Sequence, residues 1–340
     1  MKAFKEKHLR PGRKITDQFL IASLLSILIV GVSVLVFPLG KLALGFFESV
    51  LGGDHDAAVF LKDYFDFISI WIGLFLVVVL FKGNRPMLKA AKYCSTGVRK
   101  GEDSTGGIRG NRSGNNFRGF LIGLALGFGC NGFCILMSVL MGDIYLSYSG
   151  FKPIPFVLFF LCVFIQSAAE ELADRWYLYQ KLRRRYKTPW MAIVINSLVF
   201  MAMHLLNPGV SPLALGQIFL VGLLFSLFVY YYNGLWMAMA FHAAWNFTQS
   251  ILFGLPNSGI VSAYSVFKLD AASATNGLFY NVNFGVEGSV AANIILLALC
   301  IFIFVKNRRK GEHTDVWAEA DQAAIAKNAS ETAVSDAKTV

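Results

Sequence analysis

The chain has 340 residues, of which 56% are hydrophobic, and its mean hydropathy is +0.55. A soluble fold of this length cannot bury so much apolar surface, so the composition excludes an ordinary soluble globular protein and predicts an integral membrane protein. The net charge of +10 comes largely from basic runs between hydrophobic segments. That distribution favours contact with anionic lipid and argues against nucleic-acid binding.

Eight segments approach the length of about 20 mostly apolar residues that a membrane-spanning helix needs. The first, third and sixth are the clearest, whereas Glu170, Glu171, His204, His242 and Asn246 interrupt the fourth, fifth and seventh. In chain order the segments are Thr16–Phe37, Phe65–Phe81, Phe117–Met141, Pro155–Ala173, Trp190–Leu205, Leu213–Tyr232, Trp236–Phe253 and Ala291–Val305. The sequence therefore predicts an all-α, polytopic membrane protein with about eight transmembrane helices.

Positive charge alternates between the loops that join these segments. Of the 31 basic residues, 27 lie in the N-terminal arm, between the second and third segments, after the fourth, and after the eighth. Because Lys and Arg stay on the cytoplasmic side, this pattern predicts that the N and C termini are both cytoplasmic. The other four, Lys41, Lys62, Lys152 and Lys268, fall in predicted loops on the outer side.

Composition divides the chain into four regions. Residues 1–150 hold the first three spans and a basic cytoplasmic loop, and residues 151–253 hold spans four to seven. Residues 254–310 hold an external loop and the last span, and we expect the polar tail at 311–340 to be disordered. We expect a multi-pass protein of the cell membrane, and the short loops and plain N-terminus favour a prokaryotic plasma membrane.

Ionisable and amide side chains gather in three of the spans. A charged group in hydrocarbon costs about 2.5–3.5 kcal/mol on insertion scales, so a functional role is the first hypothesis for such residues. Glu170 and Glu171 lie toward the cytoplasmic end of the fourth span, His204 lies in or near the outer part of the fifth, and His242 and Asn246 lie on the seventh. Two imidazoles, a carboxylate and an amide suit acid–base or metal-assisted hydrolysis.

The spacing of these residues favours a shared site. Residues four apart share one face of a helix, so His242 points the same way as Asn246, and Glu171 the same way as Arg175. Adjacent Glu170 and Glu171 are about 100° apart around a helix. One of them can therefore face the site while the other pairs with Arg175. The sequence contains neither H-E-x-x-H nor G-x-S-x-G, so the helical zincin and serine hydrolase templates are absent.

Three short motifs occur in a fixed order. E-E-x-x-x-R covers Glu170–Arg175, F-x-x-x-H covers Phe200–His204, and H-x-x-x-N covers His242–Asn246. In this order and spacing they resemble the signatures of the CPBP, or ABI, family of intramembrane metalloproteases, which are relatives of the Ras-converting type II CAAX prenyl endopeptidases. The resemblance covers residues 151–253 and marks this region as a catalytic core. Residues 1–150 resemble no family that we can name.

The resemblance implies a role for each motif residue. Glu170 would activate the attacking water, the two motif histidines would bind or polarise around it, and Asn246 would stabilise the tetrahedral oxyanion. Glu171 and Arg175 would hold the site together, and Phe200 would pack beside it. If the reaction uses a metal, Zn²⁺ or another divalent ion would be bound by Glu170, His204 and His242.

The predicted function is hydrolysis of a peptide bond in a membrane-associated protein or peptide, by a CPBP-type membrane metalloendopeptidase. One alternative is a non-catalytic membrane factor that keeps the fold, such as a bacteriocin-immunity protein or a scaffold. Another is a transporter that uses the Glu and His residues as a proton relay. The expected partners are the peptide substrate and the lipid bilayer, with no nucleic acid.

Overall fold

The computed structural model describes residues 8–10, 14–92, 114–308 and 315–318. Within these ranges the protein is mostly helical, and its two named strands, β1 (Leu146–Tyr148) and β2 (Phe267–Leu269), form one short antiparallel pair, which confirms the all-α prediction. The α-helices are α2 (Phe19–Val36), α3 (Leu39–Val50), α4 (His55–Asp66), α5 (Ile68–Leu80), α6 (Leu88–Ala91), α7 (Phe117–Leu140), α8 (Pro153–Glu171), α9 (Tyr179–Arg185), α10 (Pro189–Met203), α11 (Pro212–Tyr232), α12 (Leu235–Phe247) and α13 (Val290–Asn307). Shorter 3₁₀ and π segments are η1 (Ile15–Asp17), η2 (Lys82–Met87), η3 (Leu172–Leu178), η4 (Thr248–Leu252) and η5 (Val286–Gly288).

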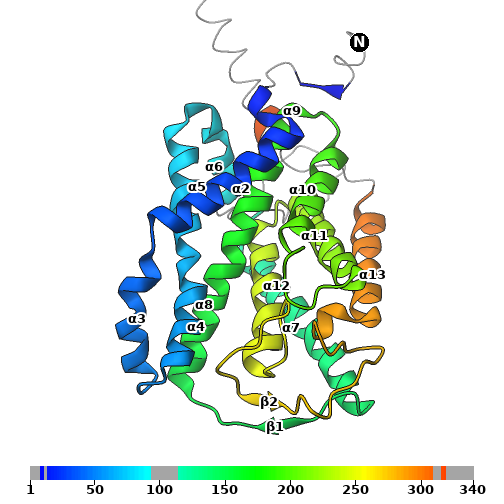
Figure 1. Ribbon diagram of the computed structural model, residues 1–340. Helices are drawn as coiled ribbons and strands as arrows, with labels where there is room; N and C mark the ends of the chain where they lie inside the picture. Colours follow the sequence, from blue (N-terminus) through cyan, green and yellow to red (C-terminus); the bar gives the residue numbers. More distant parts are fainter. Residues whose placement is uncertain (1–7, 11–13, 93–113, 309–314, 319–340) are drawn as a thin grey trace, which may run out of the picture.

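Several helices are long and apolar enough to cross a membrane. By length and composition they are Phe19–Val36, His55–Leu80, Phe117–Leu140, Pro153–Arg185, Pro212–Tyr232 and Val290–Asn307. The other two predicted spans correspond to α10, a shorter apolar helix, and to α12 with its continuation η4. The chain is therefore a multi-pass membrane protein. Figure 1 shows the start of α2 and the end of α13 on the same side of the bundle, with the two strands at the opposite end. That these ends face the cytoplasm stays a prediction.

The segment between the first two predicted spans forms two helices, α3 and α4, where we expected a loop. Asp54 caps α4 by accepting a hydrogen bond from the Ala57 amide at 3.0 Å, and α4 continues into α5 as one 26-residue helix. Lys41 therefore lies in α3, Lys62 in α4 and Lys268 in β2, so their placement in loops was wrong. The charged residues of α4 lower its hydropathy, which hides a helix whose other residues pack against α8.

The helices that carry the predicted site lie in the middle of the bundle. α12 packs along both α7 and α8, and α11 packs against α10 and α13. Two glycines of α7 allow this close approach, because a Cβ on Gly123 would collide with the Met237 carbonyl and one on Gly127 with the Phe241 carbonyl. α12 is thus held along its length by neighbouring backbone.

The polar tail departs from its expected disorder at four residues. Residues 315–318 are described, and Val316 and Trp317 are buried in an apolar cluster with Ala169, Leu172 and Trp176. The rest of the tail at 311–340, and most of the basic loop at 101–116, lie outside the described residues. The boundaries of the four predicted regions stay predictions.

Candidate active site

One cavity is lined by at least one residue from each of the three motifs. It has a volume of about 420 Å³, and its walls include Glu170 from α8, His204 at the end of α10, and His242 and Asn246 from α12. Phe200 lines a smaller adjoining space together with both histidines and Asn246. The structure therefore brings together side chains that are more than 70 positions apart in the sequence.

Glu170 faces this cavity with one oxygen unengaged. Its Oε1 accepts a hydrogen bond from Gln166 Nε2 at 2.5 Å, one helical turn earlier on α8. Its Oε2 has no hydrogen-bond partner among the described residues and lies 3.8 Å from His242 Nε2. Oε2 is itself buried although Glu170 lines the cavity, so as an oxygen without a donor it can accept a proton from a water that enters beside it.

Glu171 lies behind the cavity in a fully buried ion pair. Its Oε1 accepts hydrogen bonds from Arg175 Nη1 at 3.0 Å and from His242 Nδ1 at 3.1 Å. The division of roles predicted from spacing, with one glutamate on the site and the other on Arg175, is thus confirmed. Because an ionised carboxylate only accepts, His242 carries its proton on Nδ1 and directs the Nε2 lone pair toward Glu170.

Phe200 and Phe225 enclose the buried guanidinium of Arg175. The Arg175 Cζ lies 4.3 Å from the centre of the Phe200 ring and 5.3 Å from that of Phe225, within the range of cation–π attraction. Both rings also contact the His242 imidazole, with ring centres 6.1 and 5.5 Å away. Phe200 therefore packs beside the site, as the resemblance implied.

His204 is held by the backbone of its own motif. It lies at the C-cap of α10, where its Nδ1 donates to the Phe200 carbonyl at 2.8 Å. A carbonyl oxygen can only accept, so the Nδ1 proton is fixed and Nε2 is left as an acceptor. The four-residue spacing of F-x-x-x-H thus orients the imidazole as well as placing the ring.

The Asn246 amide is fixed at both ends. Its Nδ2 donates to Gln166 Oε1 at 3.3 Å and to Ser167 Oγ at 3.2 Å, and its Oδ1 accepts from Asn257 Nδ2 at 3.2 Å. The donor end therefore faces α8, on the side of Glu170. Both N–H groups of the amide are engaged here, so Asn246 can stabilise negative charge on a carbonyl oxygen only if that oxygen replaces one of these acceptors, of which Gln166 Oε1 is the more distant.

Residues 152–248 match the family model of the type II CAAX prenyl endopeptidases described as Rce1-like. This segment is an Rce1-like domain. It contains all three motifs, so the resemblance found in the sequence is confirmed, and it covers all of α8 to α12. No curated protein and no solved structure matched the chain. The family points to an intramembrane protease.

Three residues at the site were not predicted from the sequence. Gln166 belongs to the Rce1-like domain, and its polar side chain one turn before Glu170 in an apolar span was a usable signal. Asn257 and Glu287 lie beyond the Rce1-like domain, in the segment predicted to be only an external loop. Glu287 is buried, and it lines the space beside His204 and His242. Burial raises the pKa of its carboxyl, while the hydrogen bond from the Ser258 amide opposes the rise.

The predicted metal ligands do not assemble as a set. Over the described ranges, no three or more His, Cys, Asp or Glu side chains are grouped so as to hold a metal ion. Glu171 Oε1 is already engaged by Arg175 and His242, and Glu170 meets His242 only at 3.8 Å. Glu170, His204 and His242 line one cavity without forming a preassembled ligand group, and a metal bound by these three residues stays a prediction.

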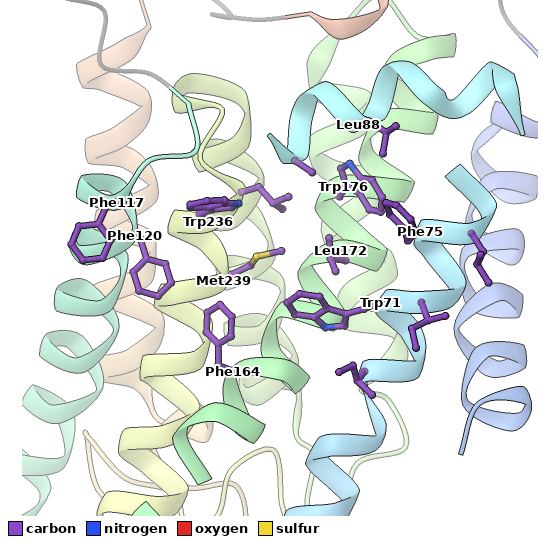
Figure 2. Close-up of a pocket in the computed structure, with 15 residues that line it drawn as sticks. Trp71, Phe75, Leu88, Phe117, Phe120, Phe164, Leu172, Trp176, Trp236 and Met239 are labelled. Carbon is purple, nitrogen blue, oxygen red and sulfur yellow. The ribbon is translucent and has the colours of Figure 1, made fainter. Parts of the chain in front are cut away.

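A larger, apolar cavity lies between α5, α7, α12 and the α8–η3 segment (Figure 2). Its volume is about 860 Å³, and none of the described residues that line it is charged. Leu172, the residue after Glu171, forms part of the wall, so the cavity borders the helix that carries both glutamates. Its aromatic lining consists of Trp71, Phe75, Phe117, Phe120, Phe164, Trp176 and Trp236.

Proposed function

We propose that the protein is an intramembrane peptidase that hydrolyses a peptide bond of a membrane-associated protein or peptide. The observation that carries the proposal is the convergence of the Glu170 carboxylate, the His242 imidazole and the Asn246 amide on one cavity of an Rce1-like domain. Each of these groups has its orientation set by a second residue, as a preorganised catalytic site requires.

The reaction that fits these groups begins with a water between Glu170 and His242. Glu170 Oε2 takes a proton from the water while His242 Nε2 accepts a hydrogen bond from it, and the water oxygen bonds to the carbonyl carbon of the substrate. The oxyanion replaces Gln166 Oε1 as the acceptor of one Asn246 Nδ2–H, and this hydrogen bond stabilises it. Glu170 then returns the proton to the amide nitrogen as the carbon–nitrogen bond breaks, which gives a free acid and a free amine.

The apolar cavity supports a substrate that carries a lipid group. A volume of about 860 Å³ with aromatic walls can take a prenyl chain, the group named in the description of the family. Burial of apolar surface contributes roughly 25 cal/mol per Å², so such a chain would supply much of the binding free energy. A prenylated peptide should therefore have a lower KM than the same peptide without the lipid.

The direct test is cleavage of a quenched-fluorescence farnesylated peptide by the purified protein in liposomes. Glu170→Gln should lower kcat by about 10²- to 10⁴-fold, because the amide cannot accept the proton from water. Glu48→Gln, on α3 far from the cavity, is the matched control and should cleave at the wild-type rate. Equal cleavage by wild type and Glu170→Gln would overturn the proposal in favour of a non-catalytic factor.

A further inference from the structure

We infer that Glu287 and Asn257 are positioning residues that set the orientation of the Asn246 amide. The inference deepens the proposed peptidase function and rests on it. Both residues lie beyond the Rce1-like domain, in the segment that leads from η4 to α13. They reach the site by folding back over the end of α12.

A continuous line of hydrogen bonds joins the three side chains. Glu287 Oε2 accepts from the Ser258 amide at 2.7 Å and from its hydroxyl at 3.2 Å, and Glu287 Oε1 accepts from Asn257 Nδ2 at 3.4 Å. Asn257 Nδ2 also donates to Asn246 Oδ1 at 3.2 Å. Glu287, Asn257 and Asn246 are all buried, so water competes little for these bonds.

The turn that carries Asn257 is itself fixed. Asn257 and Ile260 exchange two backbone hydrogen bonds of 2.9 Å, and Gly259 between them has a φ of +84°. A Cβ at Gly259 would collide with the Pro208 carbonyl, so the turn rests against the loop that follows His204. Asn257 therefore has a stable base from which to hold Asn246.

The order of donors and acceptors in these hydrogen bonds decides which end of the Asn246 amide faces the cavity. An asparagine amide has two ends of similar size, one a donor and the other an acceptor, so shape alone does not orient it. The backbone N–H of Ser258 obliges Glu287 to accept, and Glu287 in turn attracts the donor end of Asn257. Asn257 then engages Oδ1 of Asn246, which leaves Nδ2 pointing toward α8 and the cavity.

The test reverses this polarity with variants of nearly unchanged shape. Asn257→Asp places an acceptor against Asn246 Oδ1, and Glu287→Gln places a donor against Asn257 Nδ2. Each should lower kcat by about 10²-fold, the effect of losing one oxyanion donor, with KM within about twofold. In an Asn246→Ala background neither change should lower kcat further. Asp270→Asn, at an exposed position of the same segment, is the control and should match wild type.

The outcomes separate the two levels of inference. A wild-type kcat in both variants, or losses that add fully to that of Asn246→Ala, would overturn the positioning role. Both changes leave buried polar groups mismatched and should lower the unfolding temperature in every background, so kcat is measured well below the unfolding temperature of each variant. A merely structural role would lower kcat in the Asn246→Ala background as well, whereas the positioning role would not. If wild type and Glu170→Gln cleave equally, the peptidase function itself fails and the positioning role falls with it.

Discussion

Among individual side chains, Glu171 should contribute strongly to stability. It accepts from the fully buried Arg175 guanidinium, which is enclosed by the Phe200 and Phe225 rings. Removal of the carboxylate would leave a buried charge without its counterion, which costs about 3–5 kcal/mol. We therefore expect Glu171→Ala to lower the free energy of unfolding by that amount, measured by chemical denaturation in detergent. Cleavage should fall as well, because His242 loses the acceptor for its Nδ1 proton.

A matched control removes an exposed carboxylate instead. Glu48 pairs with His55 at 2.6 Å on the surface, where an ion pair contributes at most about 1 kcal/mol. Glu48→Ala should thus leave unfolding nearly unchanged. Similar losses from the two substitutions would contradict the assignment of Glu171 as the counterion that holds the site together.

The sequence predicts contacts of this kind where helical geometry alone decides them. The pairing of Glu171 with Arg175, and the shared face of His242 and Asn246, follow from a separation of four residues. The meeting of Asn257 with Asn246 was not predictable, because it depends on how an irregular segment folds back over α12. A segment without regular secondary structure has no repeating residue spacing from which its contacts could be predicted.

Where α7 and α12 pack against each other, glycine sets their separation. A Cβ on Gly127 would collide with the carbonyl of Phe241, the residue before His242. Gly127→Ala should therefore displace α12, at a cost of about 1–3 kcal/mol for overpacking. Since a displacement of about 1 Å at a catalytic group can cost 10²-fold in rate, kcat should fall more than the binding of substrate weakens. Steady-state kinetics and thermal unfolding measure the two effects.

The same helix provides the control for this prediction. A Cβ on Gly129 would have no neighbour within 4 Å, and alanine favours a helix by up to about 1 kcal/mol over glycine. Gly129→Ala should therefore be as stable as wild type or more so, with unchanged cleavage. Equal damage from both alanines would show that the glycines serve the conformation of α7 and not its contact with α12.

The prediction of whole helices succeeded where apolar length was decisive and failed at α3 and α4. The charged positions of α4, which include Asp56, Lys62, Asp63 and Asp66, kept this segment below any hydropathy threshold. Two local signals were nevertheless present: Asp54 as a helix N-cap and the four-residue spacing of Lys62 and Asp66, which pair at 2.9 Å. These two signals together predict a capped, amphipathic helix at the position of α4.

Across the complete chain, distant segments meet in one cluster of charges at the end of the bundle where α2 begins. Asp17 accepts from Arg184 at 2.5 Å and pairs with Lys181 at 2.7 Å, and Asp315 pairs with Arg10 and with Arg183. The segment before α2 and the segment after α13 are thus joined to α9, which continues the helix that carries Glu170 and Glu171. The sequence placed these basic residues on one side of the membrane, but gave no sign of their acidic partners.

This cluster predicts a loss of stability in acid that depends on Asp17. Burial by itself would raise the pKa of Asp17, but the hydrogen bonds and charges of Arg184 and Lys181 outweigh it and hold the pKa below the ordinary value of 3.8. The unfolded chain therefore takes up this proton first as the pH falls. The stabilisation is complete well above pH 3.8 and is lost as the pH drops through the lower, folded-state value.

The measurement is thermal unfolding in detergent from pH 7 down to about pH 3. Asp17→Asn should unfold at a lower temperature than wild type at pH 7, because Arg184 loses its charged partner, and its unfolding temperature should change less with pH. The unfolding temperature of Asp17→Asn should still fall somewhat in acid, because Asp315 contributes as well. Burial alone would raise the pKa of Asp315, but Arg10 and Arg183 outweigh it and lower the pKa. Asp56→Asn, at an exposed position on α4, is the control, and its unfolding temperature should change with pH as much as that of wild type. If the unfolding temperatures of Asp17→Asn and wild type change equally with pH, protonation of Asp17 does not contribute to the loss of stability in acid.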